Sequence, residues 1–323
     1  MGVSKPEERP LIVLTGPTAV GKTKLSIILA KAVNGEILSA DSMQVYRHMD
    51  IGSAKITPDE MQGVPHHMID ILDPWEPFNV FIFKQKCEEC LTGIYERSHI
   101  PIITGGTGFY IQALLKDIDF TENEENTEYR ISLERMAEEK GPEYLHEMLF
   151  KVDPASAEAI HTNNIKRTIR ALEFYHLTGE TISKHNDKER LKTSAYRSCY
   201  FVLNDERERL YRQIEQRVDE MLKQGLLDEV KSLREMGCMR DMVSMQGLGY
   251  KELLAYLDGE CTYEEAVSRI KQNTRHFAKR QLTWFRREQE VIWVNKQQFN
   301  YDDGQILEYM FKELTKREIF ISD

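Results

Sequence analysis

An eight-residue stretch near the start of the chain carries the clearest chemical signal. Residues 16–23 read GPTAVGKT and match G-x-x-x-x-G-K-[ST], the pattern of a phosphate-binding P-loop. Its glycines let backbone N–H groups turn toward phosphate oxygens, Lys22 adds a positive charge, and the Thr23 hydroxyl can hold Mg²⁺. The pattern therefore predicts a diphosphate site formed by Gly16, Pro17, Thr18, Ala19, Val20, Gly21, Lys22 and Thr23.

A single carboxylate is expected beside this loop. The apolar segment 36–40 (EILSA) ends in Asp41, and α/β sheets bind ligands at the carboxyl ends of their strands. Asp41 could serve there as a metal ligand or a general base, or it could simply cap a helix. Kinases and ATPases usually carry a second acid at the end of another strand. The segment 101–104 (PIIT) instead runs into GGTG at 105–108, although a P-loop kinase or NTPase remains an alternative.

A basic, partly aromatic segment lies near the C-terminus. Residues 266–287 contain no acid and seven basic side chains, namely Arg269, Lys271, Arg275, Lys279, Arg280, Arg286 and Arg287. Phe277, Trp284 and Phe285 lie among them. Basic groups neutralise phosphates and aromatic rings stack on bases, so contact with nucleic acid is one interpretation and a solvated helix face is the other. The net charge of −10 argues mildly against a nucleic-acid partner.

Alternating strand and helix patterns should position these residues. Short apolar runs predict buried strands at 10–14, 36–40 and 100–104, and helical spacing predicts helices at 23–33 and 81–97. Such alternation is typical of a parallel sheet covered by helices on both faces. We therefore predict an α/β P-loop core with a parallel sheet flanked by helices.

The composition changes after residue 116. Residues 117–140 are acidic and polar, helical patterns continue to about residue 185, and strand-like runs return at 199–203 (CYFVL) and 291–294. The simplest organisation is a first core segment at 1–117, an all-helical insertion domain at 118–195 and a second, mainly helical core segment at 196–323.

Composition narrows the class of protein further. Of the 323 residues, 41% are hydrophobic and 30% charged, which is typical of a folded globular chain. No apolar run reaches 18 residues and the N-terminus lacks a signal peptide, so a cytoplasmic protein without membrane contact is expected. The five cysteines, including Cys87 and Cys90, do not suggest disulfides or zinc. The adjacent His66 and His67 would point in different directions, so structural roles are expected.

Several further strings, taken together with the P-loop, resemble the tRNA dimethylallyltransferases, also called tRNA isopentenyltransferases. The strings occur in the order of that family: DSMQVY at 41–46, DIGSAK at 50–55, VPHHMIDI at 64–71, GGTGFY at 105–110, KRTIRALE at 166–173, QGLGYK at 246–251 and TRHFAKRQLTWFR at 274–286. The chain lacks the Cys/His pattern of the zinc finger found in eukaryotic members, so the resemblance is to the bacterial type.

The resemblance implies a specific activity. The family transfers a dimethylallyl group from dimethylallyl diphosphate to N6 of the adenine 3′ of the anticodon in tRNA, with Mg²⁺, and its helical insertion grips the anticodon arm. A monomer is expected. The alternatives are a P-loop kinase acting on a small molecule, a tRNA-binding protein without catalysis, and an adenylate isopentenyltransferase that uses free AMP.

The resemblance also assigns roles to individual residues. Asp41 would be the general base, Thr107 would lie at the reaction centre, and Arg217 would clamp the diphosphate, although the charge pattern alone also suits a solvent-facing Arg217. The positions expected to contact tRNA are Asp41, Ser42, Met43, Gln44, Lys166, Arg167, Thr168, Ile169, Arg170, Arg275, Lys279 and Arg280. Trp284 could instead pack in the core.

Overall fold

The protein, seen here in a computed structural model, divides into two compact units. The structure describes residues 9–120 and 128–320, so the ends of the predicted core segments and residues 121–127 of the acidic stretch lie outside the described residues. Unit 1 comprises Met1–Leu115 and Ser194–Asp323, and unit 2 comprises Lys116–Thr193. Each unit is described by itself below.

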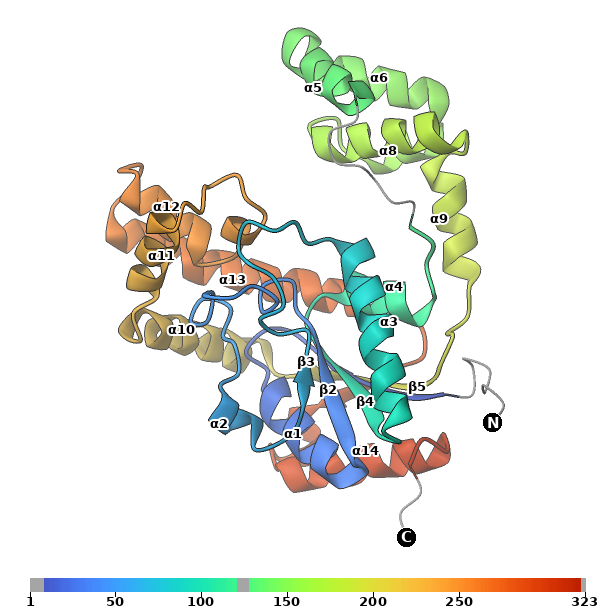
Figure 1. Cartoon of the computed structure of the whole chain (residues 1–323), viewed down its shortest axis with the longest axis vertical. Coiled ribbons are helices and arrows are strands. Elements are labelled where there is room, and N and C mark those ends of the chain that lie inside the picture. The colour runs from blue at the N-terminus through green and yellow to red at the C-terminus, as the bar shows by residue number, and fades with distance from the viewer. Residues whose placement is uncertain (1–8, 121–127, 321–323) are drawn as a thin grey trace. The chain divides into compact units, whose positions relative to one another are not determined.

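Unit 1 is built on a six-stranded sheet with the order β3-β2-β4-β1-β5-β6 (Figure 1). The strands are β1 (Pro10–Thr15), β2 (Gly35–Ala40), β3 (His66–His67), β4 (Ile100–Gly105), β5 (Arg197–Asn204) and β6 (Val291–Asn295). Every neighbouring pair runs parallel, which confirms the predicted α/β class. Parallel neighbours cannot be joined by a tight hairpin, so the chain crosses between them through helices or loops.

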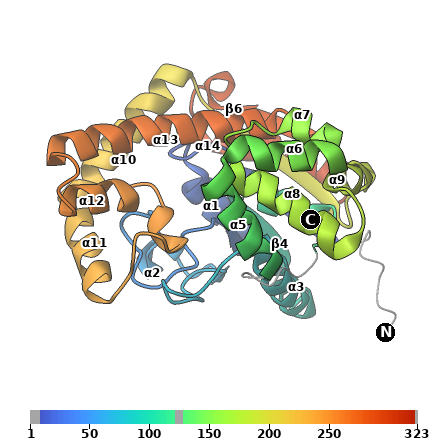
Figure 2. The ribbon, with the colours of Figure 1, turned by 90° about the horizontal axis from the view of Figure 1, so that it is seen from above.

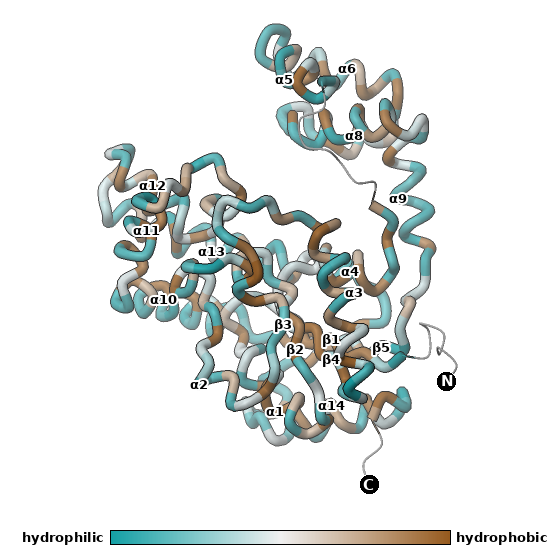
Figure 3. Tube along the Cα trace, in the orientation of Figure 1, coloured by the Kyte–Doolittle hydropathy of each residue, from teal (hydrophilic) through white to brown (hydrophobic). Residues whose placement is uncertain are grey.

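Helices cover both faces of this sheet. The helices in the described residues of unit 1 are α1 (Lys22–Val33), α2 (Pro58–Met61), α3 (Val80–Glu96), α4 (Gly108–Leu115), α10 (Arg207–Lys223), α11 (Leu226–Glu235), α12 (Tyr250–Leu257), α13 (Tyr263–Phe285) and α14 (Asp303–Lys316), with short 3₁₀ turns η2 (Ser244–Gln246) and η3 (Lys296–Phe299). Along β1, Leu11 and Val13 pack in one core with α3 and α4, while Ile12 and Leu14 pack in a second core with α1 and α14. The central strands are therefore apolar on both faces (Figure 3).

Strand register brings three loops to the same edge of the sheet. Thr15 of β1 lies opposite Gly105 of β4, which in turn lies opposite Ala40 of β2. The residues that follow these strands therefore emerge side by side at the carboxyl ends, where α/β folds bind ligands. These are the P-loop, the GGTG loop and the segment that begins at Asp41.

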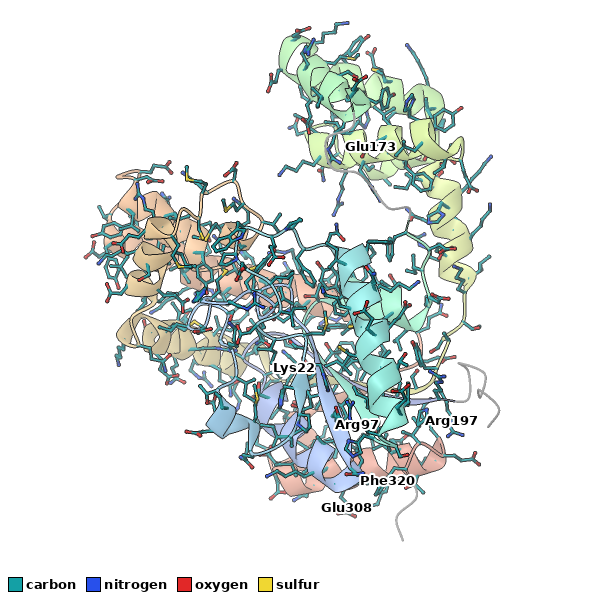
Figure 4. All side chains as sticks on the ribbon, viewed as in Figure 1. Lys22, Arg97, Glu173, Arg197, Glu308 and Phe320 are labelled. Atoms are coloured by element: carbon teal, nitrogen blue, oxygen red, sulfur yellow. The ribbon has the colours of Figure 1, made fainter. Side chains whose placement is uncertain are left out.

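The regular secondary structure in the described residues of unit 2 is entirely helical. It consists of α5 (Glu128–Lys140), α6 (Pro142–Val152), α7 (Pro154–Ala159), α8 (Ile165–Thr178) and α9 (Ile182–Leu191). Figure 2 shows α5, α6 and α8 as a compact group, and Leu133, Leu145 and Leu172 lie in its core. Glu173, labelled in Figure 4, is buried and accepts from Arg130 Nη1 at 3.1 Å, which compensates its charge inside the unit. None of the helices in the described part of the chain is both long and apolar enough to cross a bilayer.

Candidate active site

The P-loop has the backbone that a phosphate cradle needs. Gly16 has φ = 146° and Gly21 has φ = 94°, values that side-chain-bearing residues rarely adopt. A Cβ on Gly16 would also lie 2.5 Å from the Leu203 carbonyl oxygen, so only glycine fits. Helix α1 starts directly after Gly21, and no side chain caps its N-terminus. Its first N–H groups and its positive dipole end remain available to an anion.

Lys22 lies at the base of this cradle. Figure 4 shows it at the end of the sheet where α1 begins. Its Nζ donates to the carbonyl oxygens of Gly16 at 3.0 Å and Pro17 at 2.8 Å. Burial and, to a lesser degree, the charge of Arg217 lower the pKa of Lys22 to about 7, while Asp41 acts in the opposite direction. The ammonium is thus held in a site that disfavours its own charge and would favour an added anion.

Arg217 and Asp41 lie on other elements, within electrostatic range of Lys22 and of each other. Arg217 lies on α10, where burial lowers its pKa and the charge of Asp41 opposes that shift. Asp41 follows β2, and its Oδ1 accepts from Met43 N–H at 2.8 Å. The fold therefore brings Lys22, Arg217 and Asp41 together from distant parts of the sequence, and Arg217 is not a residue on a solvent-facing side of its helix.

The segment after Asp41 is fixed by contacts inside the protein. The Gln44 amide donates to the carbonyl oxygens of Ser53 and Ala54 and accepts from Ser39 Oγ at 2.9 Å. Met43 packs closely on Gly247, where an added Cβ would lie 2.8 Å from its sulfur. Ser42 is half-buried, like its neighbours. The side-chain amide of Gln44 is therefore held in place beside the P-loop by hydrogen bonds within the protein.

The adjoining loop is held by a carboxylate that no sequence motif pointed to. Glu229 of α11 accepts from the backbone N–H groups of residues 50–52 at 2.8, 2.7 and 3.1 Å, and from the Tyr250 hydroxyl at 2.7 Å. Ser53 and Ala54, which accept from the Gln44 amide, follow these residues directly. Glu229 and Tyr250 therefore also help to hold Gln44 in place. Glu229 lies in an ordinary amphipathic helix, so the sequence around it gives no signal of this role.

Thr107 lies beside the end of β2. Its N–H donates to the carbonyl oxygen of Ala40 at 3.2 Å, and α4 begins at the next residue. Gly105 has no room for a side chain, since a Cβ would lie 2.3 Å from the same Ala40 oxygen. The GGTG loop thus packs directly against the strand that ends in Asp41, which places Thr107 near the three charged groups.

The basic face of α13 borders a shallow cavity of about 480 Å³. The residues that line it are His276, Lys279, Arg280, Thr283, Trp284 and Arg287. Lys279 and Arg280 are exposed, whereas Arg275 pairs with Glu215 at 2.5 Å and is occupied within the protein. Trp284 packs edge-on against Phe109, with ring centroids 6.0 Å apart. Figure 2 shows α13 running beside α10 and α12.

The basic motif of unit 2, residues 166–170 (KRTIR), contains exposed and buried side chains. Lys166 and Arg167 are exposed at the start of α8. Thr168 and Ile169 are only 1% and 3% exposed and face the core of the unit, so their side chains cannot reach an RNA in this structure. Arg170 is half-buried, and burial lowers its pKa while Glu173 opposes the shift. The motif therefore offers two or three cations to a partner.

Comparisons with known proteins agree along the whole chain. The family model described as IPP transferase matches residues 44–288, and one described as isopentenyl transferase matches residues 10–71. A tRNA dimethylallyltransferase of Lachnoclostridium phytofermentans is 61% identical over 311 residues, which cover 96% of this chain and 99% of that protein.

Solved structures are similar as well. A full-length tRNA isopentenylpyrophosphate transferase from Bacillus halodurans matches with a TM-score of 0.72 and 44% identity, covering 96% of this chain and 98% of that one. A eukaryotic dimethylallyltransferase whose crystal structures show it acting on tRNA matches with a TM-score of 0.77 and 30% identity, covering 89% of this chain and 74% of that one.

Proposed function

The chain belongs to the IPP transferase family, and we propose that it transfers a dimethylallyl group from dimethylallyl diphosphate to N6 of the adenine 3′ of the anticodon in tRNA. The products are N6-isopentenyladenosine in the tRNA and free diphosphate. The observation that best supports this proposal is the meeting of Lys22, Arg217 and Asp41 at the mouth of the P-loop. Two cations and a carboxylate suit an anionic leaving group and a nucleophile that must lose a proton.

Each group has a distinct task in this reaction. The adenine N6 forms a bond to the carbon of the dimethylallyl group that carries the diphosphate, as the bond from that carbon to the diphosphate oxygen breaks. Asp41 accepts the proton that N6 loses. Lys22, Arg217 and the loop N–H groups stabilise the negative charge that grows on the departing diphosphate. No phosphoryl group moves, although the loop is of the kind that kinases use.

The donor set at the loop suits Mg²⁺. Magnesium prefers oxygen ligands and keeps several waters, so it binds through one or two protein oxygens and the phosphates of the substrate. The Thr23 hydroxyl at the start of α1 and the Asp41 carboxylate are oxygen donors of this kind. We assign Thr23 as the magnesium ligand, where the ion would neutralise diphosphate charge.

We further propose that residues 118–195 form the domain that grips the anticodon arm, through Lys166, Arg167 and Arg170. The exposed Lys279 and Arg280 of α13 would contact tRNA from unit 1, together with the surface from Asp41 to Gln44. We assign the protein to the cytoplasm, where its tRNA substrate is found, and expect a monomer. The oligomeric state can be checked by light scattering with size-exclusion chromatography.

A single incubation tests the proposed reaction. The protein is combined with dimethylallyl diphosphate, Mg²⁺ and tRNA from a strain that lacks this modification, and the digested nucleosides are analysed by mass spectrometry. We expect isopentenyladenosine to appear one for one with released diphosphate, without ATP. Steady hydrolysis of ATP stimulated by tRNA, with no prenylated adenine, would show that the protein is a kinase or NTPase instead. Prenylation of free AMP but not of tRNA would identify it as an adenylate isopentenyltransferase.

A further inference from the structure

One buried amide joins three elements around the proposed site. Gln281 lies on α13, is 6% exposed, and is surrounded by the loops at the carboxyl end of the sheet. Its Oε1 accepts from the Thr18 N–H of the P-loop at 2.8 Å. Its Nε2 donates to the carbonyl oxygen of Gly106 in the GGTG loop at 3.0 Å. A single side chain thus satisfies one backbone group in each of the two loops that follow the neighbouring strands β1 and β4.

Gly106 has no room for a side chain because the Gln281 amide lies against it. A Cβ on Gly106 would lie 2.0 Å from Gln281 Nε2, and the next two nearest atoms also belong to Gln281. The φ of Gly106 lies outside the left-handed region, so its backbone would accept alanine. The glycine is therefore required by the approach of the Gln281 amide, and not by the turn itself.

The contacts of Gln281 reach the groups that would carry the chemistry. Thr18 follows Gly16 and Pro17, whose carbonyl oxygens hold the Lys22 ammonium. Gly106 precedes Thr107, whose N–H binds Ala40 next to Asp41. Nearby on α13, the basic side chains Lys279 and Arg280 face solvent. A shift of either loop would therefore change the place of Lys22 relative to Asp41.

We infer that Gln281 is a positioning residue that fixes the P-loop against the GGTG loop, and so sets the geometry of the diphosphate site. It acts through Thr18 and Gly106, and touches no substrate. This inference rests on the proposed function only in taking the P-loop as a diphosphate site. Loss of the amide leaves the Thr18 N–H and the Gly106 carbonyl without a hydrogen-bond partner. Unpaired buried polar groups cost free energy, so one or both loops should shift to bring these groups into contact with water.

The test uses Gln281→Met, which keeps the length of the side chain and removes both hydrogen bonds. We expect inorganic diphosphate to bind roughly 10-fold more weakly by calorimetry, in line with the loss of a buried hydrogen-bonded pair. The affinity for tRNA should change little. The matched control is Asn273→Leu, since Asn273 on the same helix uses its amide to bind Glu252 at 2.7 Å, away from the P-loop. The control should lower the melting temperature without changing diphosphate affinity.

A second pair of variants keeps the inference testable if Gln281→Met folds poorly. Gly106→Ala should weaken diphosphate binding in the wild-type protein and add little in a Gln281→Ala background, because the clashing amide is gone. Unchanged diphosphate affinity in Gln281→Met, or an equal effect of Gly106→Ala in both backgrounds, would overturn the inference. A wild-type protein that binds diphosphate but never prenylates tRNA would overturn the proposed function alone.

Discussion

At the scale of single residues, the carboxylate of Asp41 gives the most direct test of the proposed chemistry. It follows β2, hydrogen-bonds only Met43 N–H among the contacts described, and lies within electrostatic range of Lys22 and Arg217. Removing a general base costs roughly 10²–10⁴ in rate. We expect Asp41→Ala to lower the single-turnover rate with saturating tRNA by that factor while the fold is kept. A loss smaller than about threefold, far below that range, would rule out this role.

A metal role for Asp41 would leave a different signature. If the carboxylate mainly held Mg²⁺, a large part of the lost rate would return at high Mg²⁺ concentration. If Asp41 is the base, added Mg²⁺ should restore little, because no proton acceptor is regained. Titration of the Asp41→Ala variant with Mg²⁺ therefore separates the two assignments.

The lowered pKa of Lys22 predicts a pH-dependent binding step. With a pKa of about 7, the side chain is mostly neutral in the free protein at pH 8, and a bound diphosphate would favour the charged form. Binding at pH 8 should then take up roughly 0.9 proton at this site, and affinity should fall as pH rises above 7. Calorimetry in two buffers of different ionisation enthalpy measures the uptake. The same proton uptake in Lys22→Met as in wild type would show that another group titrates.

Residues that belong to local patterns are the ones that a sequence can place. The P-loop places all its parts within eight positions, so its cradle and Lys22 could be predicted from spacing. Gln281 and Glu229 could not be predicted, because each acts on backbone groups that are distant in sequence. For Thr168 and Ile169, the motif assigned contact with RNA to residues that helical geometry turns into the core.

At the scale of elements, a buried carboxylate of β2 contacts β3 and the residue that precedes β4. Glu36 of β2 is 1% exposed and accepts from Arg97 through both oxygens, at 2.8 and 2.7 Å. His67 of β3 and His99, just before β4, lie 2.6 Å from its oxygens. Figure 4 labels Arg97, which follows α3 at the end of the sheet away from the P-loop. These contacts give a structural role to one of the two adjacent histidines.

This cluster predicts how stability depends on acid. The hydrogen bond from Arg97, opposed by burial and aided by the two histidines, lowers the pKa of Glu36 from 4.5 to about 2. Its contribution, roughly 3 kcal/mol, should be fully present above pH 4.5 and lost as pH falls toward 2, because the unfolded chain takes up the proton first. Glu36→Gln should be less stable at pH 7, and its urea midpoint should fall less between pH 5 and 3.

A matched variant controls for general acid effects. Glu308 on α14 is exposed and pairs with Lys312 at 2.7 Å, so Glu308→Gln removes a carboxylate without removing a buried network. Its urea midpoint should follow that of the wild type at each pH. If Glu36→Gln also follows the wild type, the cluster does not contribute to acid stability.

The strands that sequence patterns predicted are those with a run of apolar residues. The runs at 10–14, 36–40, 100–104, 199–203 and 291–294 correspond to β1, β2, β4, β5 and β6 within a few residues. The two-residue strand β3 was not predicted, because His66 and His67 lack the apolar signal of a strand and pair only at the edge of β2. Its hydrogen bonding depends on tertiary contact and leaves no local pattern.

At the scale of the whole molecule, net charge is a poor guide to the partner. The chain carries −10 overall, yet the exposed side chains Lys279 and Arg280 line a cavity whose lining residues include no acid. Binding to a polyanion depends on the charges at the contact and on the counterions released there, so a local basic surface can outweigh a distant acidic one. Salt dependence is therefore a more direct test than the net charge.

Neutralising the basic motif of unit 2 should change that dependence in a predictable way. Lys166 and Arg167 are exposed at the start of α8, and Arg170 is half-buried beside Glu173. Each lost phosphate contact lowers the slope of log affinity against log salt by about 1. Replacing all three with glutamine should weaken tRNA binding and reduce the slope by about 2 to 3, the smaller value applying if Arg170 stays engaged within the unit.

The control for this measurement is a pair of lysines on α14. Lys312 and Lys316 are bound to Glu308 and Glu313 at 2.7 and 2.5 Å and lie on the helix that covers the sheet face opposite α3 and α4. Replacing both with glutamine removes two positive charges, which is close to the net change in the unit 2 variant. The slope of log affinity against log salt should stay unchanged, because these side chains already have carboxylate partners. Filter binding of tRNA at several salt concentrations gives both slopes. If the unit 2 variant kept the wild-type slope, its three cations would not touch phosphate, and the grip on the anticodon arm would have to come from other residues.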